Sequence, residues 1–176
     1  MYYLISMEHS TKKLGFMFTL GGWIMGLLLL TLGFSNILDF QSNPNRSVSS
    51  AQTGNGTEII LKRNRQGHYV FNGLVNQKTA SFLVDTGATM TSVPGDLAVK
   101  LNLKRGYQYE ISTANGNSIA YATTIDQLNL GGIELFDVPA SLVPGFKGNS
   151  ILLGMNVLKH MELIQRGDQL TIRQTH

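Results

Sequence analysis

An uncharged apolar run near the N-terminus constrains this chain more than any other feature. From Leu14 to Phe34 the sequence reads LGFMFTLGGWIMGLLLLTLGF, without a single Asp, Glu, Lys or Arg. A helix rises about 1.5 Å per residue, so this run is long enough to cross a hydrocarbon layer of about 30 Å. We therefore expect one transmembrane helix at residues 14–36.

The charges beside the apolar run predict its orientation. Lys12 and Lys13 precede it and Asp39 follows it, which favours a cytosolic N-terminus at residues 1–13. The expectation is a single-pass protein of the inner (cell) membrane, with the rest of the chain on the periplasmic or extracytoplasmic side. A cleavable signal peptide is the competing interpretation. The run is longer than the roughly 7–15 residues of a signal core, and no Ala-x-Ala-like site follows before Phe40, so a retained anchor is favoured.

A polar segment separates the apolar run from the remainder of the chain. Gln41 to Thr57 reads QSNPNRSVSSAQTGNGT, in which Val48 is the single large aliphatic residue. Such a composition buries too little apolar area to offset the entropy of ordering. We therefore expect a flexible linker at residues 37–57, in which the ends of the Gln41–Thr57 segment lie on the order of 20–25 Å apart.

Residues 58–176 carry short β-like runs separated by turn residues, which predicts an all-β domain. The expected strands are Glu58–Arg63, His68–Leu74, Thr79–Val84, Gln108–Thr113, Ser118–Leu130, Ile133–Val143, Ser150–Leu153 and Gln169–Arg173. Two short helices are expected at Pro94–Leu103 and Met155–Met161, where apolar residues recur at helical spacing.

Composition excludes several functional classes. The chain has no Cys, which rules out disulfides, thiolate metal sites and Cys nucleophiles. Its four His residues are isolated from acidic residues at ligand spacing, so we expect no metal site and no cofactor. The formal net charge is +3, but the Lys and Arg residues are scattered, so a solvated surface is favoured over nucleic-acid binding. Ser92 and Ser112 lack the sequence context of a serine nucleophile.

Asp85 is the strongest candidate for a reactive group. It follows the buried-looking run Phe82-Leu83-Val84 directly, where a carboxylate is costly unless it has partners or a task. Thr86 can hydrogen-bond beside it, and Gly87 exposes backbone N–H groups to it. The alternative is an Asp that only forms a tight turn, since Asp-Thr-Gly by itself is a weak signal.

The surroundings of Asp85 strengthen the signal. The segment from Phe82 to Thr89, FLVDTGAT, resembles the active-site strand of the aspartic proteases, with Ala88 as in the retroviral type. The segment Ile151–Leu158, ILLGMNVL, is similar to the apolar strand, glycine and helix that close the retropepsin half-barrel. The resemblance spans about Ile59 to Ile172 and is greatest to bacterial membrane-anchored retropepsin-like proteases.

The resemblance implies a role for each part of the site. Asp85 would be catalytic, within an active-site loop that continues through Thr86, Gly87 and Ala88. Leu152, Leu153 and Gly154 would be structural residues beside the site. A flap that covers an extended peptide substrate would have its tip at Thr113, Ala114, Asn115 and Gly116.

A catalytic dyad of this kind needs two aspartates, and this chain supplies one. The other aspartates, Asp39, Asp96, Asp126, Asp137 and Asp168, are not followed by Thr-Gly or Ser-Gly. The sequence therefore predicts a homodimer in which each copy contributes Asp85 across a two-fold axis. Gly22 and Gly26 have the small-xxx-small spacing that lets two membrane helices approach, although tolerance of packing without a partner explains it equally well.

Two other interpretations remain open. The same half-barrel could bind extended peptides without cutting them. It could also serve as a dimerisation module in the cell envelope. Sequence favours the endopeptidase because the Asp85-Thr86-Gly87 signature is intact.

Overall fold

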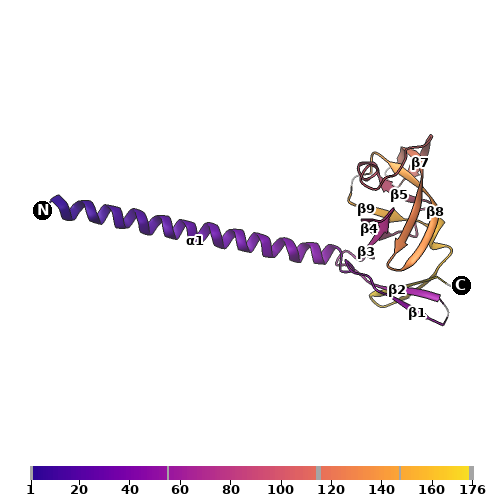
Figure 1. Ribbon diagram of the computed structural model, residues 1–176, viewed down its shortest axis with the longest axis horizontal. Coiled ribbons are helices and arrows are strands. Elements are labelled where there is room, and N and C mark those ends of the chain that lie inside the picture. Colours follow the sequence, from indigo (N-terminus) through magenta and orange to yellow (C-terminus); the bar gives the residue numbers. More distant parts are fainter. Residues whose placement is uncertain (1, 55, 114–115, 147, 175–176) are drawn as a thin grey trace. The chain divides into compact units, whose positions relative to one another are not determined.

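The computed structural model describes residues 2–54, 56–113, 116–146 and 148–174. The chain divides into two compact units, Met1–Gln41 and Ser42–His176. Figure 1 labels α1 and the strands β1–β5 and β7–β9.

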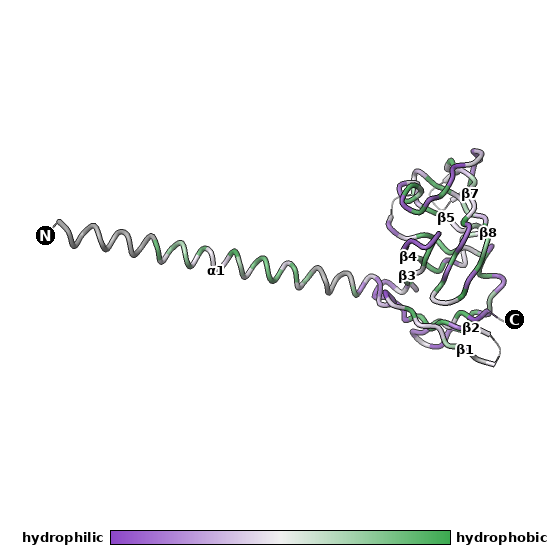
Figure 2. The backbone as a smooth tube through the Cα atoms, viewed as in Figure 1, coloured by the Kyte–Doolittle hydropathy of each residue, from purple (hydrophilic) through white to green (hydrophobic). Residues whose placement is uncertain are grey.

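The first unit is the helix α1, which runs Tyr2–Ser42. Within it, Leu14–Phe34 is apolar and none of it is buried, and Figure 2 shows hydrophobic residues recurring along the helix. A helix that is apolar on all sides without a protein partner has the character of a membrane span. An N-terminal signal sequence can meet the same criteria of length and composition, so membrane insertion stays a prediction.

The second unit is mostly β, as expected. Its larger sheet has seven strands in the order β3-β4-β9-β5-β8-β7-β6. β3 also pairs with β7, through Leu74 opposite Asn129 and Val75 opposite Leu128, so the sheet closes on itself as a barrel. The strands are β3 (Val70–Val75), β4 (Lys78–Val84), β5 (Thr91–Pro94), β6 (Gln108–Thr113), β7 (Gly116–Leu130), β8 (Ile133–Val143) and β9 (Ser150–Leu153).

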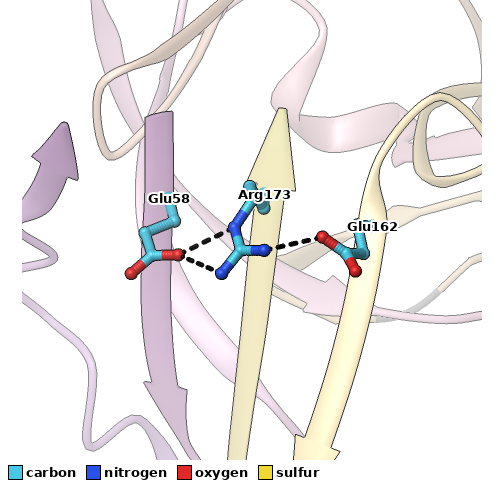
Figure 3. A network of polar contacts seen from close by, with 3 residues as sticks. All are labelled: Glu58, Glu162 and Arg173. Carbon is cyan, nitrogen blue, oxygen red and sulfur yellow. Dashed lines mark hydrogen bonds and ion pairs between the residues drawn. The ribbon is translucent and has the colours of Figure 1, made fainter. Parts of the chain in front are cut away.

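A second sheet has four strands in the order β1-β2-β11-β10. They are β1 (Ser50–Thr53), β2 (Gly56–Lys62), β10 (Glu162–Arg166) and β11 (Gln169–Gln174). Arg173 lies in β11 between Glu58 and Glu162 on the neighbouring strands (Figure 3), with ion-pair distances of 2.8 Å to each. The hydrogen bond to Glu58 is the main reason that the pKa of Arg173 is raised above its ordinary value. The row of three charges ties three strands of this sheet together.

The two sheets share one hydrophobic core. Phe71 and Phe82 stack within it, with ring centroids 5.5 Å apart. Both alternate with partly buried neighbours along β3 and β4, which is the period-two pattern of a strand with one face in the core. The largest fully buried side chains are Phe71, Phe82, Ile59, Leu61, Leu101, Ile125, Leu128, Leu130, Ile133, Ile151, Leu153 and Leu158.

The segment expected to be a flexible linker, residues 37–57, differs from that expectation. α1 continues to Ser42, and the residues after it are bonded into the second unit. Asn45 is buried and pairs with Phe71 as a β-bridge, and Ser50–Thr53 forms β1 against β2. The prediction of flexibility considered only the apolar area that this segment can bury. The segment is instead ordered mainly by side-chain amides that bond to backbone groups.

Most expected strands are present within two residues of their predicted bounds, but three strands were missed: β1, β5 and β10. The prediction of a helix at Pro94–Leu103 is wrong. Pro94 ends β5, and a 3₁₀ turn, Gly95–Leu97, is followed by turns that close at Asn102, whose φ is 56°. The helix α2 covers Met155–Leu158, one turn shorter than expected.

Candidate active site

Asp85 lies at the end of β4, at the point where the chain leaves the barrel core. β4 pairs in parallel with β9, with Leu83 opposite Leu152 and Val84 opposite Leu153. The pairing continues one residue further, because the Asp85 N–H donates to the Leu153 carbonyl oxygen at 3.1 Å. The backbone of Asp85 is thereby fixed by the sheet, while its side chain is half-buried.

The loop after Asp85 folds back on its carboxylate. The Gly87 N–H donates to Oδ1 of Asp85 at 2.9 Å, and the Ala88 N–H donates to the Asp85 carbonyl oxygen at 3.3 Å. A Cβ at position 87 would lie 3.2 Å from that same Oδ1, a tighter contact than usual. A glycine therefore suits this position, and its N–H sets the direction of the carboxylate. Thr86 is exposed beside it.

The start of α2 holds the far side of this loop. The Met155 N–H donates to the Ala88 carbonyl oxygen at 2.7 Å, and the Asn156 N–H donates to the Thr89 carbonyl oxygen at 3.0 Å. Gly154 is required immediately before the helix. A Cβ there would lie 2.6 Å from the backbone carbonyl carbon of Met90. The structure thus brings the predicted Asp85 loop and the predicted Leu152-Leu153-Gly154 segment together.

Thr91 and Asn156 form a contact that sequence reasoning missed. Thr91 is fully buried, and both its N–H and its hydroxyl donate to Oδ1 of Asn156, at 2.8 Å and 2.9 Å. The Gly154 N–H donates to the Thr91 hydroxyl oxygen at 3.3 Å, and Nδ2 of Asn156 donates to the Pro139 carbonyl oxygen at 2.8 Å. For Asn156 the available signal was a single polar residue in the apolar stretch Ile151–Leu158, whereas Thr91 lies among the hydroxyl residues Thr89 and Ser92 and gave no signal of its own.

The hairpin of β6 and β7 lies where the flap was predicted. At its described end the Thr113 hydroxyl donates to the Gly116 carbonyl oxygen at 2.7 Å, and Gly116 has a φ of 102°. Ala114 and Asn115, the predicted tip, lie outside the described residues. At the base of the hairpin the Tyr109 hydroxyl bonds to the hydroxyl of buried Ser141 in β8. The covering role of this hairpin stays a prediction.

A cavity of about 500 Å³ opens beside the base of this hairpin. Its lining includes Tyr107 and Tyr109, whose ring centroids are 5.9 Å apart, together with Met90 and Pro139. Met90 directly precedes Thr91, and Pro139 accepts a hydrogen bond from Asn156. The cavity therefore adjoins the framework that holds the Asp85 loop.

No group of three or more His, Cys, Asp or Glu side chains gathers at metal-binding distance among the described residues. The candidate site consists of one oriented carboxylate at a strand end, a helix that fixes its loop, and a hairpin and cavity nearby. Two carboxyl groups held close together form the arrangement that activates water for amide hydrolysis in general.

The fold and site define a single-lobed β-barrel of the aspartic-protease class. Residues 71–160 match the family of gag-polyprotein putative aspartyl proteases, and the chain belongs to that family. A crystal structure of a retropepsin-like aspartic protease from Rickettsia conorii is similar, with 27% sequence identity and a TM-score of 0.58. That match covers 73% of this chain and 94% of the Rickettsia chain.

Two similar proteins are themselves uncharacterized. One, from the cobV 5′ region of a Sinorhizobium species, is 29% identical over 145 residues, which cover 80% of this chain. This chain spans 62% of that relative's length. The other, from Rickettsia prowazekii (strain Madrid E), is 26% identical over 185 residues, covering 91% of this chain and 79% of the relative.

Proposed function

We propose that this protein is a membrane-anchored aspartic endopeptidase, active as a homodimer with one Asp85 from each copy. The observation that carries the proposal is the Asp85 loop: a strand-end carboxylate oriented by the Gly87 N–H and braced by α2. Family membership supports a protease. Catalysis, the dimer and the membrane location are our proposals.

The proposed chemistry needs the two Asp85 carboxyl groups to lie about 3 Å apart, where they cannot both ionise and so share one proton. The ionised Asp85 takes a proton from a water molecule as the water oxygen bonds to the scissile carbonyl carbon. The protonated Asp85 donates a hydrogen bond to the carbonyl oxygen as negative charge develops there. A proton then passes to the amide nitrogen as the C–N bond breaks, which releases an amine and a carboxylic acid.

The proposed substrate is an extended peptide. The β6–β7 hairpin of each copy would cover it and supply backbone hydrogen bonds. The cavity near the hairpin base combines apolar and aromatic side chains, Met90, Tyr107 and Tyr109, with the charged Lys104, Arg105 and Asp126, and offers a mixed surface for a substrate side chain.

The proposed anchor is the Leu14–Phe34 segment of α1, with the protease domain on the extracytoplasmic side. Confinement to a membrane raises the effective concentration of the second copy, so a dimer that is weak in solution would still form in place.

The test is cleavage of a mixed peptide library by the full chain in detergent, at acidic and neutral pH. We expect Asp85→Asn to abolish cleavage and leave the folded domain intact by circular dichroism. Asp96→Asn is the matched control, since Asp96 is exposed in the 3₁₀ turn. Unchanged cleavage by Asp85→Asn would overturn the proposal. Binding of library peptides by the wild type without any cleavage would instead support the non-catalytic peptide-binding module.

A further inference from the structure

The residues between α1 and β2 form a strap on the second unit; we use this name for residues 42–53. At its start, the Ser42 carbonyl oxygen accepts a hydrogen bond from Nδ2 of Asn64 at 2.9 Å. Nδ2 of Asn43 donates to Oδ1 of Asn72 at 2.9 Å. The first strap residues are therefore bonded to the loop after β2 and to β3.

Asn45 is the most constrained residue of the strap. Its Nδ2 donates to the carbonyl oxygens of Lys62 and Val70, at 2.9 Å and 2.7 Å, and its Oδ1 accepts from the Lys62 N–H at 2.7 Å. Its own carbonyl oxygen accepts from the Asn72 N–H at 3.1 Å. Asn45 is only 8% exposed. A buried amide with each side-chain atom bonded to backbone fixes the chain at this position.

The strap continues to pack after Asn45. Val48 packs against the hydrophobic core, and a Cβ at Gly131 would lie 2.7 Å from its Cγ1. Ser50–Thr53 then pairs with Gly56–Ile59 as β1 against β2. Residues 42–53 are thus part of the domain and add no length to the connection with α1.

This docking sets an upper limit on the reach of the domain. The apolar run ends at Phe34 and the domain begins at Ser42, so residues 35–42 make the whole connection. They span about 12 Å as a helix and about 28 Å if fully extended. A free linker ending at residue 57 would extend to about 80 Å. The limit follows from chain connectivity, whatever the angle between helix and domain.

We propose that the protein acts on juxtamembrane peptide segments of other membrane-anchored proteins, because the docked strap keeps the Asp85 site close to the bilayer. This inference rests on the proposed function. A domain of this size is on the order of 35–40 Å across. The distance from the membrane surface to the scissile bond of a substrate is therefore at most about the length of the connection plus the diameter of the domain.

The experiment uses the full chain in proteoliposomes with a ladder of tethered substrates. Each substrate is a single apolar helix, a Gly/Ser spacer of about 5, 15, 30 or 60 residues, and the peptide that the wild type cuts best in solution. We expect wild-type cleavage to fall by about ten-fold or more from the shortest spacer that is cut to the longest, as effective concentration falls with distance.

An insertion tests whether the short connection is the cause. About 30 Gly/Ser residues placed between Gln41 and Ser42 add roughly 30 Å of average reach, and we expect them to flatten the dependence on spacer length. The same insertion ahead of Lys12 is the matched control and should leave the wild-type dependence unchanged. Cleavage of the free peptide reports that each variant is folded and active.

The outcomes separate the two proposals. If the wild type cuts neither free nor tethered peptide, the proposed function fails. If it cuts the free peptide but all tethered substrates equally, or the insertion changes nothing, the juxtamembrane inference is overturned. Loss of α1 from the mature protein by signal cleavage, seen by mass spectrometry, would overturn it as well.

Discussion

Thr91 donates two hydrogen bonds to one oxygen atom, Oδ1 of Asn156, from its backbone N–H at 2.8 Å and its hydroxyl at 2.9 Å. Thr91 opens β5 and Asn156 lies in α2, so both follow the Asp85 loop and are 65 residues apart in the sequence. Because α2 also binds the carbonyl oxygens of Ala88 and Thr89, this pair fixes both ends of the segment that follows Asp85. The orientation of the candidate catalytic group thus depends on a contact with no reactive role of its own.

Replacing Asn156 should weaken both stability and activity. Asn156→Ala removes the oxygen that accepts hydrogen bonds from both the buried Thr91 hydroxyl and the Thr91 N–H, so we expect a loss of about 1–3 kcal/mol in the free energy of unfolding. Cleavage should fall further than stability predicts, because the Asp85 loop loses its brace. Urea denaturation and peptide cleavage measure the two effects. Asn149→Ala, at an exposed position, is the control, and equal behaviour of the two variants would contradict the role given to Asn156.

Gly154 should not accept a side chain. In Gly154→Ala the new Cβ would lie 2.6 Å from the Met90 carbonyl carbon and 2.8 Å from the Thr91 nitrogen, so the backbone on one side must move. We expect destabilisation of about 1–3 kcal/mol, as for other overpacked sites, with a loss of cleavage. Gly54→Ala, where nothing lies within 4 Å, is the control. A thermal melt of both variants decides the matter, and wild-type stability for Gly154→Ala would show that the close approach is not needed.

The dimer makes a quantitative prediction for mixtures. If activity needs one Asp85 from each copy, mixed dimers of wild type and Asp85→Asn are inert. Co-expression in equal amounts should then leave about a quarter of the activity of the same total amount of wild type. A chain that is active by itself would leave about half. Cleavage rate against the fraction of wild-type chain, determined by mass spectrometry, distinguishes the squared from the linear dependence.

The strap should contribute to the stability of the domain. Asn45→Ala leaves the Lys62 N–H and two backbone carbonyl groups without their partner, and we expect a loss of about 2–3 kcal/mol. Hydrogen exchange at the Lys62 and Asn72 amides should also become faster. Ser49→Ala, at an exposed strap position, serves as the comparison. Unaltered exchange in Asn45→Ala would mean that the strap is not anchored through this side chain.

The two ion pairs of Arg173 in the four-stranded sheet should contribute unequally to stability. Glu58 meets both Nε and Nη2 of Arg173, at 2.9 Å and 2.8 Å, whereas Glu162 meets only Nη1 and its side chain is 50% exposed (Figure 3). Glu58→Gln should therefore lower the melting temperature more than Glu162→Gln, since exposed ion pairs contribute little. The reverse order would contradict this assignment.

The raised pKa of Arg173 determines in which pH range this residue affects the stability of the domain. The pKa of Arg173 is raised, chiefly by its hydrogen bond with Glu58. A group with a raised pKa contributes stability at every pH below its unfolded value and loses it only as pH rises through the folded value. Arg173 should therefore add no pH dependence across the neutral range.

The sequence alone determined the features that depend only on residues close together in the sequence. The apolar length of Leu14–Phe34, the alternation along the strands and the turn at Asp85-Thr86-Gly87 are local patterns, set by helix rise, strand period and the conformational freedom of glycine. They were enough to predict a mostly β domain, and the resemblance of the segments Phe82–Thr89 and Ile151–Leu158 to known motifs implied the retropepsin-like family.

Only the tertiary structure decided which polar side chains meet. The parallel pairing of β4 with β9 brings Asp85 to Leu153. The antiparallel pairing of β5 with β9 brings Thr91 close to Asn156 across 65 residues of sequence. Asn45 likewise finds Lys62 and Val70 only when β2 and β3 are in place. Hydrogen bonds are directional and short, so their partners are fixed by strand register and chain packing, which no local pattern in the sequence specifies.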